Sequence, residues 1–173
     1  ALPRQQTLRA LIDWSYDLLD PAEQDALRQV SVMPGAFDHA LASAVLAETP
    51  ARTVDLLETL VARSLLQTAR DGRSGDVRYR LLETIRAYAY QRLIDDGGAE
   101  TTHHRHARHA RHVADRLDAC PMAFTMMVEH RLLADDALLA LDWAHGRDDR
   151  TLGARLVSCA GPIFIGRGLS DKG

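Results

Sequence analysis

The stretch RYRLLETIRAYAYQRL, residues 78–93, decides the fold of this chain. It begins as a short strand and continues, with almost no loop, into an amphipathic helix. The helix is expected from about residue 82 to residue 95, where Gly97 and Gly98 end it and mark the best candidate for a domain boundary. Its apolar spacing predicts that five side chains pack together: Leu82, Ile85, Tyr88, Ala89 and Leu93.

Helices are also predicted ahead of this stretch, over residues 7–19, 20–32, 38–47 and 53–63. Thr7 is a suitable cap for the first of them. Asp20-Pro21-Ala22-Glu23 restarts the chain, because it supplies a capping side chain, a proline for the first turn and an acid where the helix dipole favours one. Pro34-Gly35 and Pro50 are expected to close the second and third helices.

The pattern changes after these helices. Residues 65–69 and 77–81 are short strand candidates, and the DGRSGD between them, residues 71–76, favours a hairpin loop because it contains two Gly and two Asp. Three helices followed by a β-hairpin are the plan of a winged helix. Residues 1–97 are therefore expected to form a winged-helix domain with a three-helix core and a β-hairpin wing.

The second half of the chain, residues 98–173, reads as helical throughout. Helices are expected over residues 99–119, 125–146 and 151–167, separated by short polar breaks. Antiparallel helix pairs of this kind are typical of an α-solenoid, so this half is interpreted as the start of TPR-like repeats. The predicted fold class is mainly α, a winged helix followed by a helical segment.

Three landmarks occur in one order: IDWSYDLLDP (residues 12–21), LVARSLLQ (residues 60–67) and the 78–93 stretch. Together they resemble the winged-helix segment that follows the nucleotide-binding core of STAND-type, NB-ARC-like signalling ATPases, which include large bacterial transcriptional regulators. The resemblance continues into DDALLALDWAHGRDD, residues 135–149, which looks like the start of the helical repeats in those regulators.

In that family the helix after the wing opens with a Met-His-Asp triplet, and its His reaches the ADP β-phosphate. Leu81, Leu82 and Glu83 occupy these positions here, so the acid is kept and a leucine replaces the histidine. A leucine cannot donate a hydrogen bond to phosphate, and the resemblance therefore implies coupling by packing. Arg80 and Arg86 complete the surface expected to face the nucleotide-binding domain, and residues 14–17 form a second landmark surface.

The resemblance implies a regulatory segment that relays nucleotide state between an ATPase core and a helical sensor domain. Its partners would be that nucleotide-binding domain and the downstream repeats, with DNA bound through another domain of the larger protein. The sequence contains no G-x-x-x-x-G-K-[ST], no metal-binding pattern and no nucleophile with a base, so it predicts neither an enzyme nor a cofactor of its own. ATP or ADP is expected elsewhere in the larger protein.

A DNA-binding winged-helix transcription factor is the alternative. The helix at residues 53–63 would enter the groove, but it offers Asp55 and Glu58 where phosphates would lie, with arginines only at its ends. The wing carries Arg70, Arg73 and Arg78, largely offset by its aspartates. Charge reasoning therefore favours intramolecular packing over direct DNA reading.

The run THHRHARHARH, residues 102–112, is the most unusual composition in the chain. Five histidines alternate with Arg105, Arg108 and Arg111. Three interpretations stay open: a metal site or pH sensor, an anion-binding or DNA-contacting face, and a solvated helix face with one buried histidine. The last is preferred, because the arginines oppose a bound cation.

Composition sets the remaining limits. The formal charge of −3 and pI near 6.2 give no overall attraction to nucleic acid or anionic membrane. Two isolated cysteines, Cys120 and Cys159, and the lack of a membrane-length apolar run favour a cytoplasmic location. Trp14 and Trp143 both sit in apolar helical stripes and are expected in the core. The chain is interpreted as part of a larger protein.

Overall fold

The computed structural model describes residues 3–70, 76–118, 130–147, 150–154 and 157. The chain divides into two compact units, one comprising residues 1–32 and 36–102 and the other residues 33–35 and 103–173. Within the described residues, no helix is long and apolar enough to cross a membrane. Cys120 and Cys159 lie outside the described residues.

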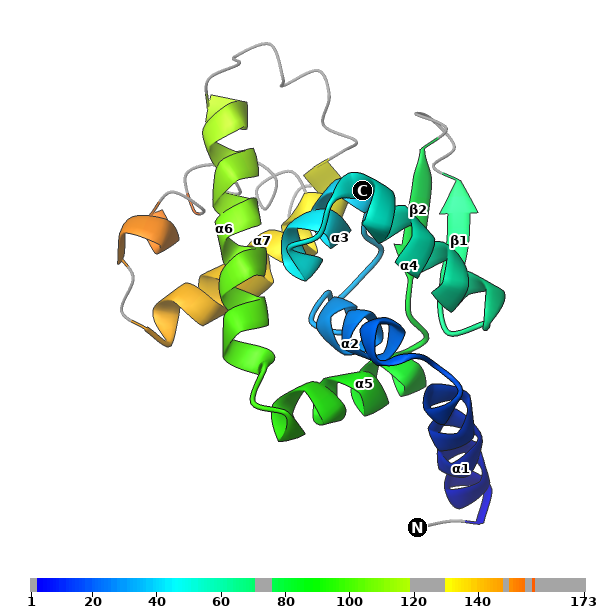
Figure 1. The fold of residues 1–173 in the computed structure, drawn as a ribbon. Coiled ribbons are helices and arrows are strands. Elements are labelled where there is room, and N and C mark those ends of the chain that lie inside the picture. Colours follow the sequence, from blue (N-terminus) through cyan, green and yellow to red (C-terminus); the bar gives the residue numbers. More distant parts are fainter. Residues whose placement is uncertain (1–2, 71–75, 119–129, 148–149, 155–156, 158–173) are drawn as a thin grey trace, which may run out of the picture. The chain divides into compact units, whose positions relative to one another are not determined.

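The first unit contains the winged helix (Figure 1). Its elements in chain order are α1 (Pro3–Asp17), α2 (Pro21–Val30), α3 (His39–Leu46), α4 (Pro50–Ala62), β1 (Gln67–Arg70), β2 (Val77–Arg80) and α5 (Glu83–Asp95). The second unit takes up most of α6 (Ala99–Asp118), then α7 (His130–His145) and a further helical turn at residues 150–154. The predicted fold class, a mainly α winged helix followed by a helical segment, is confirmed.

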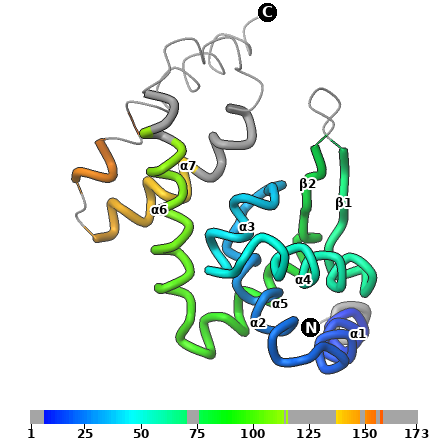
Figure 2. The backbone as a smooth tube through the Cα atoms, turned by 45° about the horizontal axis from the view of Figure 1, so that its top comes forward, coloured from blue at the N-terminus to red at the C-terminus, as the bar shows by residue number. Residues whose placement is uncertain are grey.

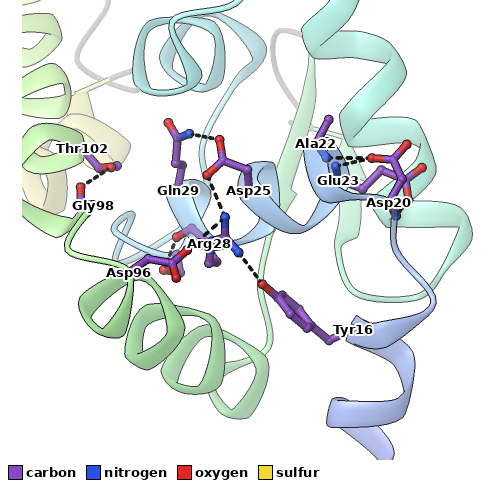
Figure 3. A network of polar contacts seen from close by, with 11 residues as sticks. Tyr16, Asp20, Ala22, Glu23, Asp25, Arg28, Gln29, Asp96, Gly98 and Thr102 are labelled. Atoms are coloured by element: carbon purple, nitrogen blue, oxygen red, sulfur yellow. Dashed lines mark hydrogen bonds and ion pairs between the residues drawn. The ribbon is translucent and has the colours of Figure 1, made fainter.

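Local signals explain where most helices begin and end. Asp20 accepts hydrogen bonds of 2.8 Å from the backbone N–H groups of Ala22 and Glu23, and the Glu23 carboxylate accepts one of 2.9 Å from the Asp20 N–H (Figure 3). This is the reciprocal capping box that the Asp-Pro-Ala-Glu run predicted. At the end of α5, Gly97 adopts a φ of 71° and Gly98 donates back to the Leu93 carbonyl, so the predicted stop is confirmed.

Two boundary predictions were wrong. Thr7 does not cap α1, because that helix already begins at Pro3. Pro50 does not close α3, which ends at Leu46 with Ala47 in the left-handed region. Pro50 is instead the first residue of α4, capped by Thr49, because proline lacks the N–H that a first helical turn leaves without an intrahelical partner.

The core of the first unit forms around α2, which packs against α3, α4 and α5. Its fully buried members come from all of these helices and from the segment before α3: Leu27, Val30, Phe37, Val45, Leu57, Leu60 and Ala89. The hydroxyl of Ser43 on α3 also donates to the buried Thr53 of α4 at 3.1 Å, which holds these two helices in register. One face of each helix is therefore committed to this core.

The wing is an antiparallel hairpin of β1 and β2 (Figure 2). In it Thr68 pairs with Tyr79 and Arg70 with Val77. Phe37 extends the pairing, because its N–H and C=O both bond to Tyr79, at 2.9 and 2.8 Å, and the two rings stack. Beside this pair, Arg78 forms an ion pair of 2.9 Å with Asp38. The wing is thus attached to the segment that leads into α3.

The second unit contains a small apolar cluster made by Ala107 of α6, Ala140 and Ala144 of α7, and Leu152. Small side chains let these helices approach closely. Of the helix predicted over residues 125–146, α7 covers residues 130–145, and residues 125–129 lie outside the described part. Most of the predicted 151–167 helix also lies outside it. The predicted division at residues 97 and 98 stays a prediction.

Asp38 serves two purposes, and two substitutions separate them. Its Oδ1 accepts the Leu41 N–H at 2.8 Å as the cap of α3, while Oδ2 binds Arg78. Asp38→Asn keeps a capping acceptor and removes the charge, so we expect a loss of less than about 1 kcal/mol in the free energy of unfolding. Asp38→Ala removes both and should cost roughly 1 kcal/mol more. Urea unfolding of both variants measures the difference; equal losses would show that the cap contributes nothing.

Candidate functional site

The helix that would read DNA in a winged helix is α4. Its inner face is buried through Thr53, Leu56, Leu57 and Leu60. Its exposed side chains include two acids, Asp55 and Glu58, and two arginines, Arg52 and Arg63, near the ends. The outward face therefore has no net positive charge, and its acids lie where a groove-reading helix needs cations.

The three wing arginines predicted to contact DNA are not equivalent. Arg78 is engaged with Asp38, and its side chain is only 15% exposed. Arg70 is exposed at the end of β1, and Arg73 lies outside the described residues. One of the three candidates is therefore structural, because releasing Arg78 toward a phosphate would break the contact between β2 and α3.

Leu81, Leu82 and Glu83, which occupy the positions of the Met-His-Asp triplet, differ in exposure. Leu81 is buried, whereas Leu82 is 45% exposed at the N-cap of α5, so the prediction that Leu82 packs inside was wrong. Arg80 is exposed beside it. Glu83 accepts two hydrogen bonds from Arg86, at 2.8 and 3.1 Å. That hydrogen bonding lowers the pKa of the exposed Glu83 and raises the pKa of Arg86.

An apolar stripe on α1 is exposed. It consists of Leu8 (45% exposed), Leu11 (56%) and Trp14 (63%), continued just after the end of the helix by Leu18 (48%), and these residues recur at helical spacing along one side. The prediction that Trp14 lies in the core was wrong. The helix and the two residues that follow it carry a second apolar stripe, formed by Ile12, Tyr16 and Leu19, which is buried in the first unit.

A polar network fixes the buried side of α1 to the winged helix. Asp13 accepts a 2.6 Å hydrogen bond from the Tyr88 hydroxyl and a 3.1 Å bond from Arg92, both on α5. The Arg92 guanidinium lies over the rings of Tyr16 and Tyr88, 5.5 and 5.2 Å from their centroids. These contacts lock α1 onto α5, so the exposed stripe is presented on a fixed helix.

A second polar network joins α1 to α2 and to the end of α5 (Figure 3). Arg28 donates to the Tyr16 hydroxyl at 2.7 Å and forms ion pairs of 3.1 Å with Asp25 and Asp96. Burial opposes the charge of Arg28, but its hydrogen bonds to Tyr16 and Asp25 and the charge of Asp96 outweigh it and raise its pKa. Arg28 thus connects three helices.

The histidine and arginine run lies on α6. His106 is buried, His103 is half-buried, and burial together with the neighbouring His106 lowers the pKa of His103. Arg108 and Arg111 are exposed, and Arg105 is half-buried. Within the described ranges, no three His, Cys, Asp or Glu side chains come close enough to hold a metal ion.

Trp143 of α7 extends the surface of this run. It is half-buried and packs against the alanine cluster of the second unit. Its ring meets that of His104 edge-on, with centroids 5.6 Å apart, and the guanidinium of Arg147 lies 4.9 Å from its centroid. Cations and an aromatic ring therefore adjoin on one surface of α6 and α7.

Sequence reasoning missed the contacts that fix the wing and α1. Asp38 and Arg78 are 40 residues apart, and Asp13 and Tyr88 are 75 apart, so no local pattern joins them. One signal was present for the exposed stripe: α1 has more apolar positions than a single buried face can use.

Residues 19–94 match the model of the winged helix-turn-helix domain. Together with the observed helices and hairpin, this match shows that the chain contains a winged helix-turn-helix domain. The predicted relationship to STAND-type, NB-ARC-like ATPases is more specific than this finding and stays a prediction.

Relatives of known name are much longer than this chain. A Mycobacterium tuberculosis protein, whose name assigns it provisionally to the HTH-type transcriptional regulators, is 38% identical over 96% of this chain and 19% of its own length. The regulatory protein AfsR of Streptomyces coelicolor is 36% identical over 49% of this chain and 8% of its own length. A solved structure of a Lactococcus lactis ZitR mutant in apo form is a distant likeness, with 19% identity and a TM-score of 0.39 over 59% of this chain and 77% of that one. The chain thus spans about a fifth of the first relative.

The Tyr88 hydroxyl gives an alkaline test of the network on α1. Burial and the hydrogen bond to Asp13 raise the pKa of Tyr88 to about 12, against about 10 for an unfolded tyrosine. A raised pKa means that the stabilisation is complete below pH 10 and disappears as the pH rises toward 12. Tyr88→Phe should cost about 1 kcal/mol at pH 8 and lose less further stability between pH 10 and 12 than the parent chain. Chemical unfolding across this range measures both effects; parallel pH profiles would contradict the role of this hydroxyl.

Proposed function

We propose that this chain is a regulatory segment of a larger transcriptional regulator, in which the winged helix docks another domain. The observation that carries the proposal is the stripe of Leu8, Leu11, Trp14 and Leu18, held outward on a helix whose other side is locked in place. An exposed apolar stripe of this extent is typical of a surface that a partner covers.

The charges of the winged helix support docking over DNA reading. The outward face of α4 carries Asp55 and Glu58, and Arg78 is held by Asp38. Bringing phosphates to that face would place acids against them, which costs free energy. The same acids present no obstacle to a protein partner.

The partner we propose is a nucleotide-binding domain of STAND type in the same polypeptide. The relative from M. tuberculosis is about five times as long as the region it shares with this chain, which leaves room for such a domain. ATP or ADP would then be bound outside these residues, and this segment would be a non-catalytic relay in the cytoplasm. Because Leu82 is exposed and cannot donate to phosphate, it would sense the domain by packing.

The helical segment after the winged helix would connect the relay to the helical sensor domain. α6 and α7 pack through alanines, as neighbouring helices of a repeat do. We propose that they open a TPR-like series whose movement follows that of the winged helix.

DNA binding by the winged helix itself is the second candidate. The match to a helix-turn-helix model and the names of the relatives favour it. Four exposed arginines lie on α4, directly after it or on the wing: Arg52, Arg63, Arg70 and Arg80. Duplex binding that weakens steeply with salt and is lost in Arg63→Gln/Arg70→Gln would support this candidate.

The docking proposal is tested in the full-length protein by hydrogen exchange with ADP and with a non-hydrolysable ATP analogue. We expect residues 8–18 and 80–86 to change protection between the two states, and Leu11→Ser/Trp14→Ser to abolish the difference. The same double substitution should change the stability of the 173-residue chain by no more than about 0.5 kcal/mol, because both side chains are exposed.

Ile94→Ser is the matched control, since Ile94 is similarly exposed (46%) but lies at the end of α5. It should leave the nucleotide-dependent difference intact. Identical protection of residues 8–18 in both nucleotide states would contradict the docking proposal.

A further inference from the structure

The basic stripe of α6 is a surface that the docking proposal does not use. We define it as His104, Arg105, Arg108, Arg111 and His112, which lie within one arc of the helix at i, i+3 and i+4 spacing. The segment from residue 101 to residue 114 contains three arginines and five histidines and no acid, although the chain as a whole carries a charge of −3. Positive charge is therefore concentrated on this surface.

The structure turns this arc outward. His104, Arg108, Arg111 and His112 are exposed and Arg105 is half-buried, while Ala107 is buried in the cluster with α7. Two acids of α6 flank the stripe: Glu100, four residues before His104, and Asp115, whose Oδ2 lies 3.9 Å from the Nε of Arg111. On α7, Asp142 is exposed but lies about 100° or more around the helix from Trp143 and Ala140.

The geometry points to the sugar–phosphate backbone of nucleic acid as the partner of this stripe. From His104 to Arg111 the helix rises about 10 Å, which matches several consecutive phosphates of a strand. Trp143 and Arg147 continue the surface onto α7, so an aromatic ring adjoins the cations. Such a surface would grip the backbone without reading sequence.

Other anionic partners fit this surface less well. An anionic membrane would require large, exposed apolar side chains among the outward-facing cations; the basic stripe contains none, and the adjoining Trp143 is half-buried. A small free anion would require groups that converge on a point, whereas these side chains are spread along the helix. An extended polyanion is the partner that matches a linear row of charges.

The test is fluorescence anisotropy of the 173-residue chain with a 25-base-pair DNA duplex of arbitrary sequence at pH 7.5, over a range of salt concentrations. We expect Kd in the micromolar range or weaker, as for binding without sequence preference, and a linear fall of log K with log salt. Arg108→Gln/Arg111→Gln should reduce the slope by about 2 and weaken binding at least about tenfold in 50 mM salt. Asp115→Asn should strengthen binding, because it removes the acid beside Arg111.

The matched control is Arg63→Gln/Arg70→Gln, which removes two exposed arginines from the winged helix. It should leave the affinity and the salt slope unchanged, and circular dichroism should show that every variant keeps its helices. Loss of binding in the control but not in the α6 variant would overturn this inference and support DNA reading by the wing. Lack of binding at 20 mM salt would also overturn it, while the docking proposal, measured by hydrogen exchange, would stand unaffected.

Discussion

The winged helix depends on one carboxylate, that of Asp38. One of its oxygens caps α3 and the other holds Arg78 of β2, so the start of a helix and the middle of the hairpin share a single side chain. The paired backbones and stacked rings of Phe37 and Tyr79 lie directly beside it. The hairpin and the start of α3 are therefore joined through this side chain as well as through the backbone pairing of Phe37 and Tyr79. Arg78 would have to leave this contact in order to bind a phosphate.

A second constraint gives α1 its two different faces. Asp13 and Tyr16 anchor one side to Tyr88, Arg92 and Arg28, and Leu11 and Trp14 remain exposed on the other. α5 carries both the residues that hold α1, Tyr88 and Arg92, and, at its start, Leu82 and Glu83. The helix α5 therefore links α1 to the positions of the Met-His-Asp triplet. A partner that moved α1 would therefore act on α5 as well, which is how the proposed relay through packing would work.

The net charge of the chain hides a local concentration of positive charge in the second unit. The overall charge of −3 would suggest repulsion from nucleic acid, yet α6 presents three arginines along a stretch without acids. The alanines that pack α6 onto α7 determine which residues of the histidine and arginine run are covered. Buried His106 and exposed Arg108 are two residues apart in sequence but lie on opposite sides of the helix.

The sequence by itself determined the order of helices and the hairpin, because apolar periodicity, the capping box at Asp20 and the glycines at 97 and 98 act within a few residues. It also determined that the outward face of α4 is acidic. The spacing of the leucines identifies the buried face of this helix, and Asp55 and Glu58 lie outside that face. The tertiary structure alone decided that Trp14 and Leu82 face outward, that Pro50 opens a helix and that Arg78 is held by Asp38. These outcomes depend on which of two apolar faces finds a neighbour and on contacts between residues up to 75 positions apart, and a local pattern contains neither.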